Sequence, residues 1–278
     1  MPFLKLFFNL LLTLIAALPA LIAQDLPPNV LIKKIELKCH FVEVDRMQQI
    51  YAVSDDHTLL KFSASGELQK SFNENSLGAI SSVDVSNPFQ PLVFYNEYQT
   101  AVVLDRSLSE LYRFKLSELN FTQIDALALS SDNMLWLYDP NNFKLIKFES
   151  NGTVNLESPD LSSILESSFF PKSLREAEFK VFVNDPEKGM LIFDNFGNFI
   201  QRLSLNAIGY FQVSGAFLIW MDADKQLHRL HLKTFREQIS PLADLGIDSK
   251  NLLQLCIMPN SYLLRYPDRI ELIEKSKP

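Results

Sequence analysis

The chain has 278 residues, of which 47% are hydrophobic, enough to build one large β domain or two small ones. Charged residues make up 21%, a balance that argues against disorder over the whole chain. The formal net charge is −7, which makes nucleic-acid binding a poor interpretation because phosphate recognition needs clustered basic side chains.

The first 23 residues have the pattern of a secretory signal peptide. Lys5 is the only charged residue before Asp25, an apolar run covers residues 6–18, and small residues precede Gln24. We expect cleavage after Ala23, which would leave residues 24–29 as an exposed leader on an exported chain with a net charge of −8. An uncleaved membrane anchor is the other interpretation, and the polar and proline residues within the segment weaken it.

The clearest structural pattern lies in Ile124–Gly152. IDALAL, MLWLY and FKLIKF have the composition and alternation of short strands, and SSDN, DPNN and ESNG are turn sequences between them. A sheet of this size cannot bury both faces alone, so the unit needs neighbours of its own kind.

Related units run from Phe41 to Ile273. Each has a second strand that is followed by a polar turn residue, and this position recurs at intervals of 37 to 46 residues, a period typical of four-stranded propeller blades. The repeated residues are Asp55, Asn96, Asp139, Asp185, Asp222 and Asp268. Asp at such a position caps its own backbone, so we interpret the repetition as structural.

The sixth unit has only three strands before the chain ends. Val30–Leu37 is a further strand that belongs to no other unit, and it can pair with Arg269–Ile273. Such pairing would close the ring and remove an open edge. The sequence therefore predicts an all-β fold, a six-bladed β-propeller over residues 30–278 that the N-terminal strand closes.

Three units resemble NHL-type repeats of the six-bladed, TolB-like propeller superfamily. In each, a second strand ends in Asp, a third strand ends in Phe, and a glycine turn follows. These positions are Asp55, Phe62 and Gly66, then Asp139, Phe148 and Gly152, then Asp185, Phe193 and Gly197. The resemblance implies the fold, and this fold hosts many unrelated functions.

A narrower resemblance lies in Ser82–Glu110, SVDVSNPFQPLVFYNEYQTAVVLDRSLSE. This stretch is similar to a family of exported Bacteroidota propellers without assigned enzymatic activity, and a mature chain that begins at Gln24 is similar to many exported proteins of that group. The resemblance implies a place in the periplasm or at the periplasmic side of the outer membrane. It further implies a role in protein secretion, as a plug-like subunit of the type 9 translocon.

One constellation suggests a metal site. Glu43, Asp84 and Asp125 are spaced 41 residues apart, each near the first strand of its unit. First strands line the centre of a propeller, so three carboxylates could ring one mouth of the channel and bind a hard divalent cation. The alternative is three independent polar residues in a water-filled channel, because a shift of one residue in strand phase reverses the direction of a side chain.

Other catalytic patterns are missing from the sequence. His228 and His231 are three residues apart on an expected strand and so point to opposite faces, which does not favour a shared metal. The chain contains no G-x-S-x-G, P-loop or G-x-G-x-x-G motif, and we expect no catalytic residue and no organic cofactor. Cys39 and Cys256 could form a disulfide that clasps the two ends of the domain, or remain two buried thiols.

The loop Ser158–Pro171 carries apolar residues at spacings of three and four, which predict a short amphipathic helix. Exposed, they would form a docking surface for a protein partner, and the alternative is that they pack on their own propeller. These residues are Leu161, Ile164, Leu165, Phe169 and Phe170.

Taken together, the sequence favours an exported, non-enzymatic propeller that acts as a protein-interaction or scaffold module. The alternative is a metal-dependent hydrolase, lactonase-like, with its site at the channel mouth.

Overall fold

The structure is a computed structural model, and it describes residues 29–165, 169–205 and 207–276. Asn29–Lys275 form one compact unit, and the terminal segments 1–28 and 276–278 are assigned to a second. The predicted signal peptide 1–23 and residues 24–28 of the leader lie outside the described residues, so both stay predictions. No described helix is long and apolar enough to cross a membrane.

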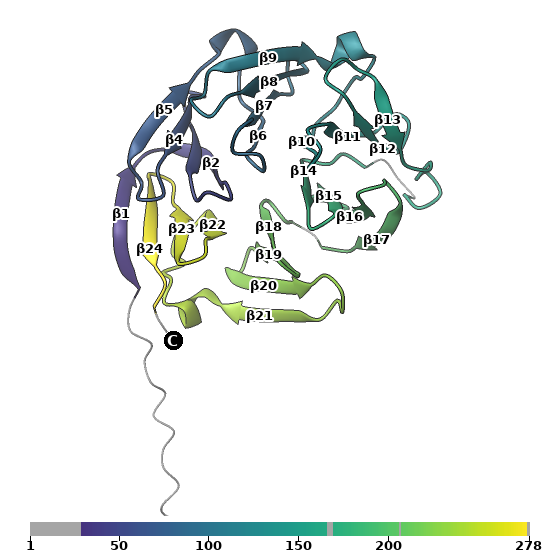
Figure 1. Cartoon of the computed structure of the whole chain (residues 1–278). Helices are drawn as coiled ribbons and strands as arrows, with labels where there is room; N and C mark the ends of the chain where they lie inside the picture. Colours follow the sequence, from purple (N-terminus) through teal and green to yellow (C-terminus); the bar gives the residue numbers. More distant parts are fainter. Residues whose placement is uncertain (1–28, 166–168, 206, 277–278) are drawn as a thin grey trace, which may run out of the picture. The chain divides into compact units, whose positions relative to one another are not determined.

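Six four-stranded antiparallel sheets make up Asn29–Lys275, and Figure 1 shows them arranged around a common centre. Blade 1 consists of β2 (Cys39–Val44), β3 (Ile50–Ser54), β4 (Leu59–Phe62) and β5 (Leu68–Phe72). Blade 2 consists of β6 (Ser82–Asp84), β7 (Leu92–Tyr95), β8 (Thr100–Leu104) and β9 (Glu110–Lys115). Blade 3 consists of β10 (Leu127–Leu129), β11 (Leu135–Asp139), β12 (Lys144–Phe148) and β13 (Val154–Glu157).

Blade 4 consists of β14 (Ser173–Ala177), β15 (Lys180–Asp185), β16 (Gly189–Asp194) and β17 (Phe199–Leu203). Blade 5 consists of β18 (Phe211–Ser214), β19 (Phe217–Met221), β20 (Gln226–His231) and β21 (Glu237–Pro241). Blade 6 consists of β22 (Gln254–Ile257), β23 (Ser261–Arg265), β24 (Arg269–Glu274) and β1 (Val30–Glu36). Three short 3₁₀ helices lie between blades in the described residues: η2 (Asn75–Leu77), η3 (Leu116–Leu119) and η4 (Leu242–Leu245).

The position of a strand within its blade follows its composition. The middle strands β3, β8 and β11 are buried along their whole length and are apolar except for one polar residue at an end of each, Ser54, Thr100 and Asp139. The fourth strands β5 and β9 are exposed at almost every position and are rich in charged and polar residues. Strands buried on both faces need apolar side chains at every position, whereas outer strands face solvent.

The hydrophobic core is divided into layers between neighbouring blades. One layer joins blades 2 and 3 and includes Phe94 and Phe148, and another joins blades 3 and 4 and includes Trp136 and Phe193. Cys39 and Cys256 lie in the layer between blades 6 and 1, where both thiols are buried and free. Each blade therefore depends on both neighbours for its burial, as a propeller requires.

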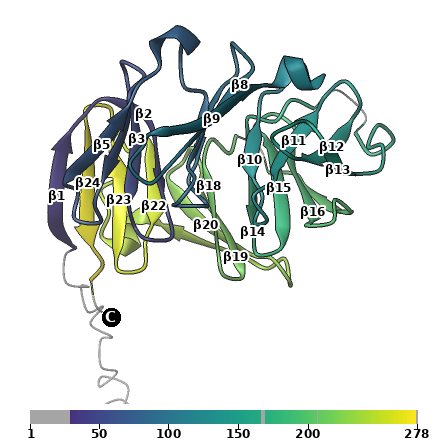
Figure 2. The ribbon, with the colours of Figure 1, turned by 45° about the horizontal axis from the view of Figure 1, so that its top comes forward.

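The N-terminal strand closes the ring, as the sequence predicts. β1 pairs antiparallel with β24 in a register that runs from Val30 opposite Glu274 to Glu36 opposite Arg269. Figure 2 shows β1 at the outer edge of the sheet that contains β24, β23 and β22. The two ends of Asn29–Lys275 thus share one blade.

Two of the repeated turn aspartates, Asp139 and Asp185, have the structural role expected of them. The Oδ1 atom of Asp139 accepts hydrogen bonds from the backbone N–H of Asn141 at 2.9 Å and Asn142 at 3.3 Å, and Asp185 binds its own turn in the same way. These carboxylates accept hydrogen bonds from the backbone of the turn between the second and third strands, so their role is to stabilise that turn.

Candidate functional site at the centre of the propeller

A cavity of about 400 Å³ lies among the first strands of five blades. Its walls come from β2, β6, β14 and β22 and from the segment around Tyr210 that leads into β18. Residues of the turn between β19 and β20 also line it. The titratable side chains that line it are His40, Glu43, Lys172, Arg175, Tyr210, Asp222, Lys225 and Arg265.

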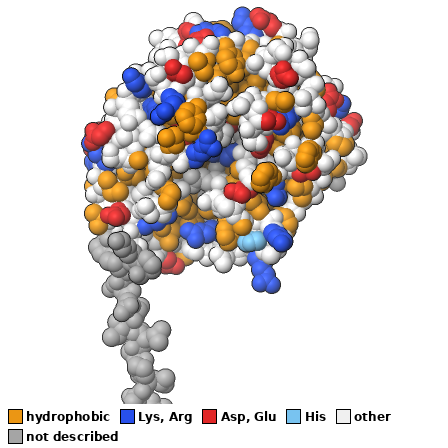
Figure 3. All heavy atoms as spheres, in the orientation of Figure 1, with side chains coloured by type: hydrophobic (Ala, Val, Ile, Leu, Met, Phe, Trp, Pro, Cys, Tyr) orange, Lys and Arg blue, Asp and Glu red, His pale blue; other side chains and the backbone are white. Residues whose placement is uncertain are grey.

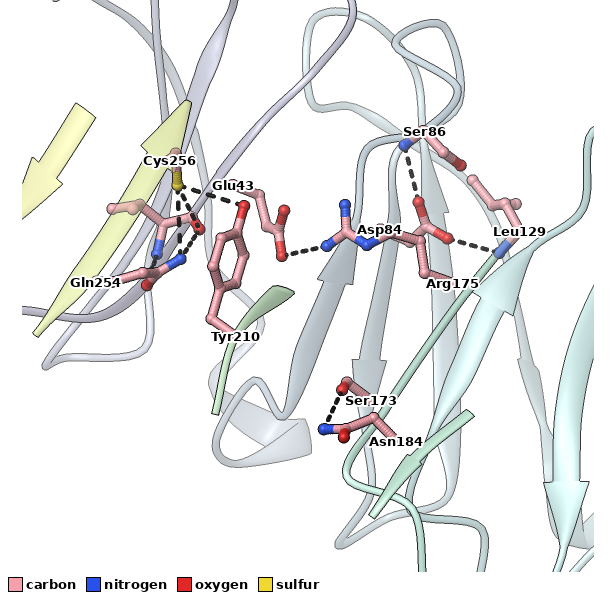
Figure 4. Close-up of polar contacts among 11 residues, drawn as sticks. Glu43, Asp84, Ser86, Leu129, Ser173, Arg175, Asn184, Tyr210, Gln254 and Cys256 are labelled. Carbon is pink, nitrogen blue, oxygen red and sulfur yellow. Dashed lines mark hydrogen bonds and ion pairs between the residues drawn. The ribbon is translucent and has the colours of Figure 1, made fainter. Parts of the chain in front are cut away.

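An ion pair spans the centre from blade 1 to blade 4. The Nη2 atom of Arg175 lies 2.8 Å from Oε1 of Glu43, and Figure 4 shows the two side chains pointing toward each other. Glu43 is only 8% exposed, and its Oε2 atom has no hydrogen-bond partner among the described residues. Burial raises the pKa of the Glu43 carboxyl, while Arg175 opposes that rise by stabilising the carboxylate.

Tyr210 and Cys256 lie beside this ion pair. The Sγ atom of Cys256 is 3.3 Å from the hydroxyl of Tyr210, and the guanidinium of Arg175 lies over the rings of Tyr210 and Phe211. Burial raises the pKa of Tyr210 and raises that of Cys256 to about 12, so both are neutral at ordinary pH. Glu43, Arg175, Tyr210 and Cys256 therefore form one polar cluster, of which the first three residues line the cavity.

Gln254 joins the first strands of blades 6 and 1. Its Nε2 atom donates to the carbonyl oxygen of Val42 at 2.7 Å, and its Oε1 atom accepts from the backbone N–H of Val42 at 3.2 Å. The side-chain amide thus imitates strand pairing between two blades that have no shared ladder at this point.

The three predicted metal ligands each have a partner in the protein. Glu43 pairs with Arg175, and Asp125 pairs with Lys172 at 2.7 Å. Asp84 accepts hydrogen bonds at 2.8 Å from the backbone N–H groups of Ser86 and Leu129 (Figure 4). A cation bound by all three would have to displace two basic side chains.

The described residues include no group of three or more His, Cys, Asp or Glu side chains placed to hold a metal ion. Metal binding by Glu43, Asp84 and Asp125 stays a prediction. Elemental analysis of protein purified without chelator, compared with the Asp84→Ala variant, would test it. The same holds for the metal-dependent hydrolase that such a site would support.

The histidines have separate surroundings, in keeping with the argument from strand phase. His228 lies between two carboxylates, with its Nε2 atom 2.8 Å from Asp222 and its Nδ1 atom 2.7 Å from Glu237. His231 accepts hydrogen bonds from the backbone of the turn that follows it.

The apolar residues of Ser158–Pro171 divide into two groups. Leu161, Leu165 and Phe169 are buried in the layer between blades 3 and 4, as in the packing alternative. Ile164 and Phe170 remain exposed, so a role in partner binding stays a prediction for these two. The described part of the segment forms a single turn rather than a helix, with the N–H groups of Ile164 and Leu165 both bonded to the carbonyl of Leu161.

The sequence analysis did not predict a set of exposed apolar side chains in the turns of the propeller. Large apolar side chains are exposed in turns between first and second strands and between third and fourth strands. In a meander of four antiparallel strands these turns lie at the same end, so they share one face of the propeller. We call these side chains the turn-face residues: Met47, Phe89, Phe179, Phe196 and Phe235.

Two of the turn-face residues combine exposure with an unfavourable backbone. Phe179 is 78% exposed at a φ of 57°, and Phe235 is also exposed at a φ of 53°. A bulky residue at positive φ is uncommon, because the left-handed region favours Gly, Asn and Asp. The signal in the sequence was a Phe in a turn, as in DNFGN around Phe196, where polar residues are the norm.

No protein-family model matches this sequence, and no curated protein matches it. Among solved structures, a streptogramin B lyase has a TM-score of 0.58 at 11% identity, covering 84% of this chain and 78% of that one. The virginiamycin B lyase of Staphylococcus aureus has a TM-score of 0.58 at 8% identity, covering 87% and 98%. BamB from Moraxella catarrhalis has a TM-score of 0.47 at 11% identity, covering 84% and 71%.

The fold is a six-bladed β-propeller. The TM-scores of 0.58 show a shared fold with the two lyases, and at 8% and 11% identity the fold alone does not transfer a function.

Proposed function

We propose that this protein is a non-enzymatic interaction module that contacts a protein partner through its turn-face residues. The observation that carries the proposal is the exposure of large apolar side chains in turns of blades 1, 2, 4 and 5 on a single face. The order of the strands places them at the same end of the sheets, although up to 188 residues separate them in sequence.

Solvation opposes Phe at these positions, and backbone energetics also oppose it at Phe179 and Phe235. The exposed part of a phenyl ring gains nothing from burial in the free protein, and the left-handed conformation of Phe179 costs roughly 1–2 kcal/mol. Figure 3 shows hydrophobic side chains interspersed with acidic and basic ones on the face it draws, so exposed apolar groups are not confined to one region. The turn-face residues are distinguished by their place in turns, where the fold itself favours polar residues and glycine.

The chemistry of this face fits a protein better than other partners. Aromatic side chains and Met are enriched in the buried parts of protein interfaces. A formal net charge of −7 gives no general attraction to nucleic acids or to anionic lipids. The partner surface that would match these side chains is a set of apolar pockets.

A place in the cell is part of the proposal. The signal-peptide pattern of residues 1–23 supports export, and the likeness of Ser82–Glu110 to exported Bacteroidota propellers supports the periplasm or the periplasmic side of the outer membrane. On the same grounds we propose an accessory role in protein secretion, as a plug-like subunit of the type 9 translocon.

Two variants separate partner binding from stability. Phe179→Gly suits the left-handed turn position and should raise stability by about 1 kcal/mol while it removes a contact side chain. Phe196→Asn replaces a second exposed ring in a turn that tolerates Asn. Ile239→Thr is the control, since Ile239 is 57% exposed on the outer strand β21, away from the turns.

The test is quantitative recovery of partners with tagged protein from native cells, in both envelope and soluble fractions. The proposal predicts a stoichiometric envelope protein with the parent and with Ile239→Thr, and at least tenfold less with the Phe179→Gly, Phe196→Asn double variant. Equal recovery with the double variant, or no stoichiometric partner with the parent, would contradict it.

A further inference from the structure

The central cavity has an excess of positive charge within an acidic protein. Four basic side chains line it, and two acidic ones do so, although the chain as a whole has a net charge of −7. The basic residues are Lys172, Arg175, Lys225 and Arg265, and the acidic residues are Glu43 and Asp222. A concave site lined mainly by one sign of charge concentrates ions of the opposite sign.

Two of the basic side chains have no carboxylate partner among the described residues. Arg265 donates to neutral oxygens only, the carbonyl of Cys39 at 2.9 Å and the side-chain amide of Gln254 at 3.3 Å. Lys225 lies partly buried in the turn between β19 and β20 and forms no ion pair within the described chain. A cation removed from water without an ion pair is unfavourable, and burial lowers the pKa of Arg265, while the charge of Asp55 acts in the opposite direction.

Arg175 retains donors for a ligand. A guanidinium carries five N–H groups, and in the described structure the bond from Nη2 to Glu43 is the hydrogen bond that Arg175 makes through its side chain. The rings of Tyr210 and Phe211 hold the guanidinium on one side, and the same group lines the cavity. Its orientation is therefore fixed before any ligand arrives, which lowers the entropy lost on binding.

The remaining lining combines polar side chains (His40, Ser81, Ser82, Ser173 and Gln254) with apolar ones. Phe41, Tyr210, Phe211, Met221 and Leu253 line the cavity together with the basic side chains. A volume of about 400 Å³ lies within the range of small-molecule sites and fits a molecule between one residue and a short peptide in size. The ligand that matches these walls has an anionic end and an apolar end.

We propose that this cavity binds a carboxylate that carries an adjacent apolar group. Arg175, Lys225 and Arg265 would contact the carboxylate, and Phe41, Phe211 and Met221 the apolar group. Guanidinium groups match a carboxylate in shape as well as charge, since two parallel N–H donors meet its two oxygens. Such a ligand is either a free small carboxylate or the C-terminal residue of a peptide, because both present the same chemistry.

The site is independent of the proposed partner surface. The cavity opens among the segments that lead into the first strands and at the turn between β19 and β20, whereas the turn-face residues lie at the opposite ends of the strands. The cavity can therefore fail to bind a carboxylate while the turn-face residues still bind a protein partner. The turn-face residues can likewise fail to bind a partner while the cavity binds a carboxylate.

The test is calorimetric titration with four probes: N-acetylphenylalanine, its amide, the tripeptide Gly-Gly-Phe with a free carboxylate, and the same tripeptide amidated. The proposal predicts that an acid binds with a Kd below about 1 mM, that the matching amide binds at least tenfold more weakly, and that added salt weakens binding. Tighter binding of N-acetylphenylalanine than of the tripeptide acid points to a free small carboxylate, equal affinity shows that the last residue alone fills the site, and binding of the tripeptide acid alone points to a peptide C-terminus.

Variants locate the binding. Lys225→Gln should weaken binding of the acid probes at least fivefold. The melting temperature should not change, because Lys225 makes no ion pair that stabilises the described fold. Arg265→Gln should do the same but also lower stability, since it removes the bond to Cys39. Lys233→Gln removes one positive charge from an exposed turn outside the cavity and should have no effect. No binding of either acid at millimolar concentration, or acid and amide of equal affinity, would overturn the proposal.

Discussion

At the scale of single residues, the imidazole of His228 has the most defined electrostatic surroundings. It stacks on Trp220, with ring centroids 4.8 Å apart, and it bridges Asp222 and Glu237 through its two ring nitrogens. Burial alone would lower the pKa of His228, but the two carboxylates outweigh this and raise it above the ordinary value. Protonated His228 is therefore favoured in the folded state.

The sign of this shift gives a prediction for stability against pH. The stabilisation from protonated His228 is fully present below the unfolded pKa of about 6.5 and is lost as pH rises through the higher folded value. His228→Gln should therefore destabilise the protein by roughly 1 kcal/mol more at pH 5.5 than at pH 9, a modest figure because both carboxylates are partly exposed.

Urea unfolding of both proteins at the two pH values measures the difference. Asp222→Asn is a matched variant that keeps a hydrogen-bonding side chain and removes one of the charges. An equal effect of His228→Gln at both pH values would mean that the ring acts by packing on Trp220 alone.

Sequence reasoning at this scale found residues but not their partners. The repeat spacing placed Glu43 and Asp84 on the inner strands β2 and β6, as the structure has them. It could not find Arg175, because the Glu43 carboxylate and the Arg175 guanidinium come from blades 132 residues apart. An ion pair across a ring leaves no local pattern in the sequence.

At the scale of elements, polar side chains join the inner strands of neighbouring blades. Gln254 binds both backbone groups of Val42 between blades 6 and 1, and Asp84 binds the N–H of Leu129 between blades 2 and 3. Glu176 joins blades 4 and 3, with hydrogen bonds from Ser130 and Ser131. These bonds fix the angle between blades where hydrophobic packing is not directional.

The Gln254 side chain should be the most sensitive of these contacts, because it is 3% exposed and serves two backbone groups. Gln254→Leu leaves the N–H and the carbonyl of Val42 without this partner, and we expect a loss of roughly 2–4 kcal/mol in unfolding free energy. Gln238→Leu, on the exposed outer strand β21, should change it by less than about 0.5 kcal/mol. Denaturant unfolding of the two variants compares them directly, and similar small losses for both would contradict the structural role of Gln254.

Strands were more predictable than loops. The pattern of IYAVS and LWLYD gives β3 and β11 because a strand buried on both faces must be apolar throughout. The helix expected in Ser158–Pro171 did not form in the described part, since Leu161, Leu165 and Phe169 find their burial in the layer between blades 3 and 4. Spacing alone cannot distinguish a helical face from a turn that docks on existing strands.

At the scale of the whole unit, the ring is closed by hydrogen bonds between its two ends. β1 covers the edge of β24, and Arg265 of blade 6 bonds to the carbonyl of Cys39 in blade 1. No disulfide takes part in the closure, since Cys39 and Cys256 are both free. The closure was predictable because the sixth unit lacked a strand and Val30–Leu37 had no other place.

Two chains of different length test this closure. A chain that begins at Asn29 keeps β1 and should unfold in one cooperative transition. A chain that begins at Leu37 leaves β24 as an open edge next to an exposed core layer, and should melt at least 10 °C lower or aggregate. Equal melting temperatures would show that β1 adds no stability to the ring.

The thiols report on the same region. Burial raises the pKa of Cys39 to about 11 and that of Cys256 to about 12, so neither forms a reactive thiolate at neutral pH. We expect no thiol modification by Ellman's reagent in the native protein and two modified thiols per chain in denaturant, with a melting temperature that a reductant does not change. Fewer than two modified thiols per chain, when native protein is denatured without reductant, would instead indicate a disulfide.

The central claim is that the turn-face residues contact a protein partner, and site-specific photo-crosslinking measures that contact. A photoreactive phenylalanine analogue replaces Phe196, and in a parallel chain it replaces Tyr98, which is exposed in the turn between β7 and β8 on the opposite face. On irradiation of native cells, the account predicts one discrete crosslinked species from position 196 and much less from position 98. A crosslink from position 98 alone, or none from position 196 with full-length protein present, would contradict it.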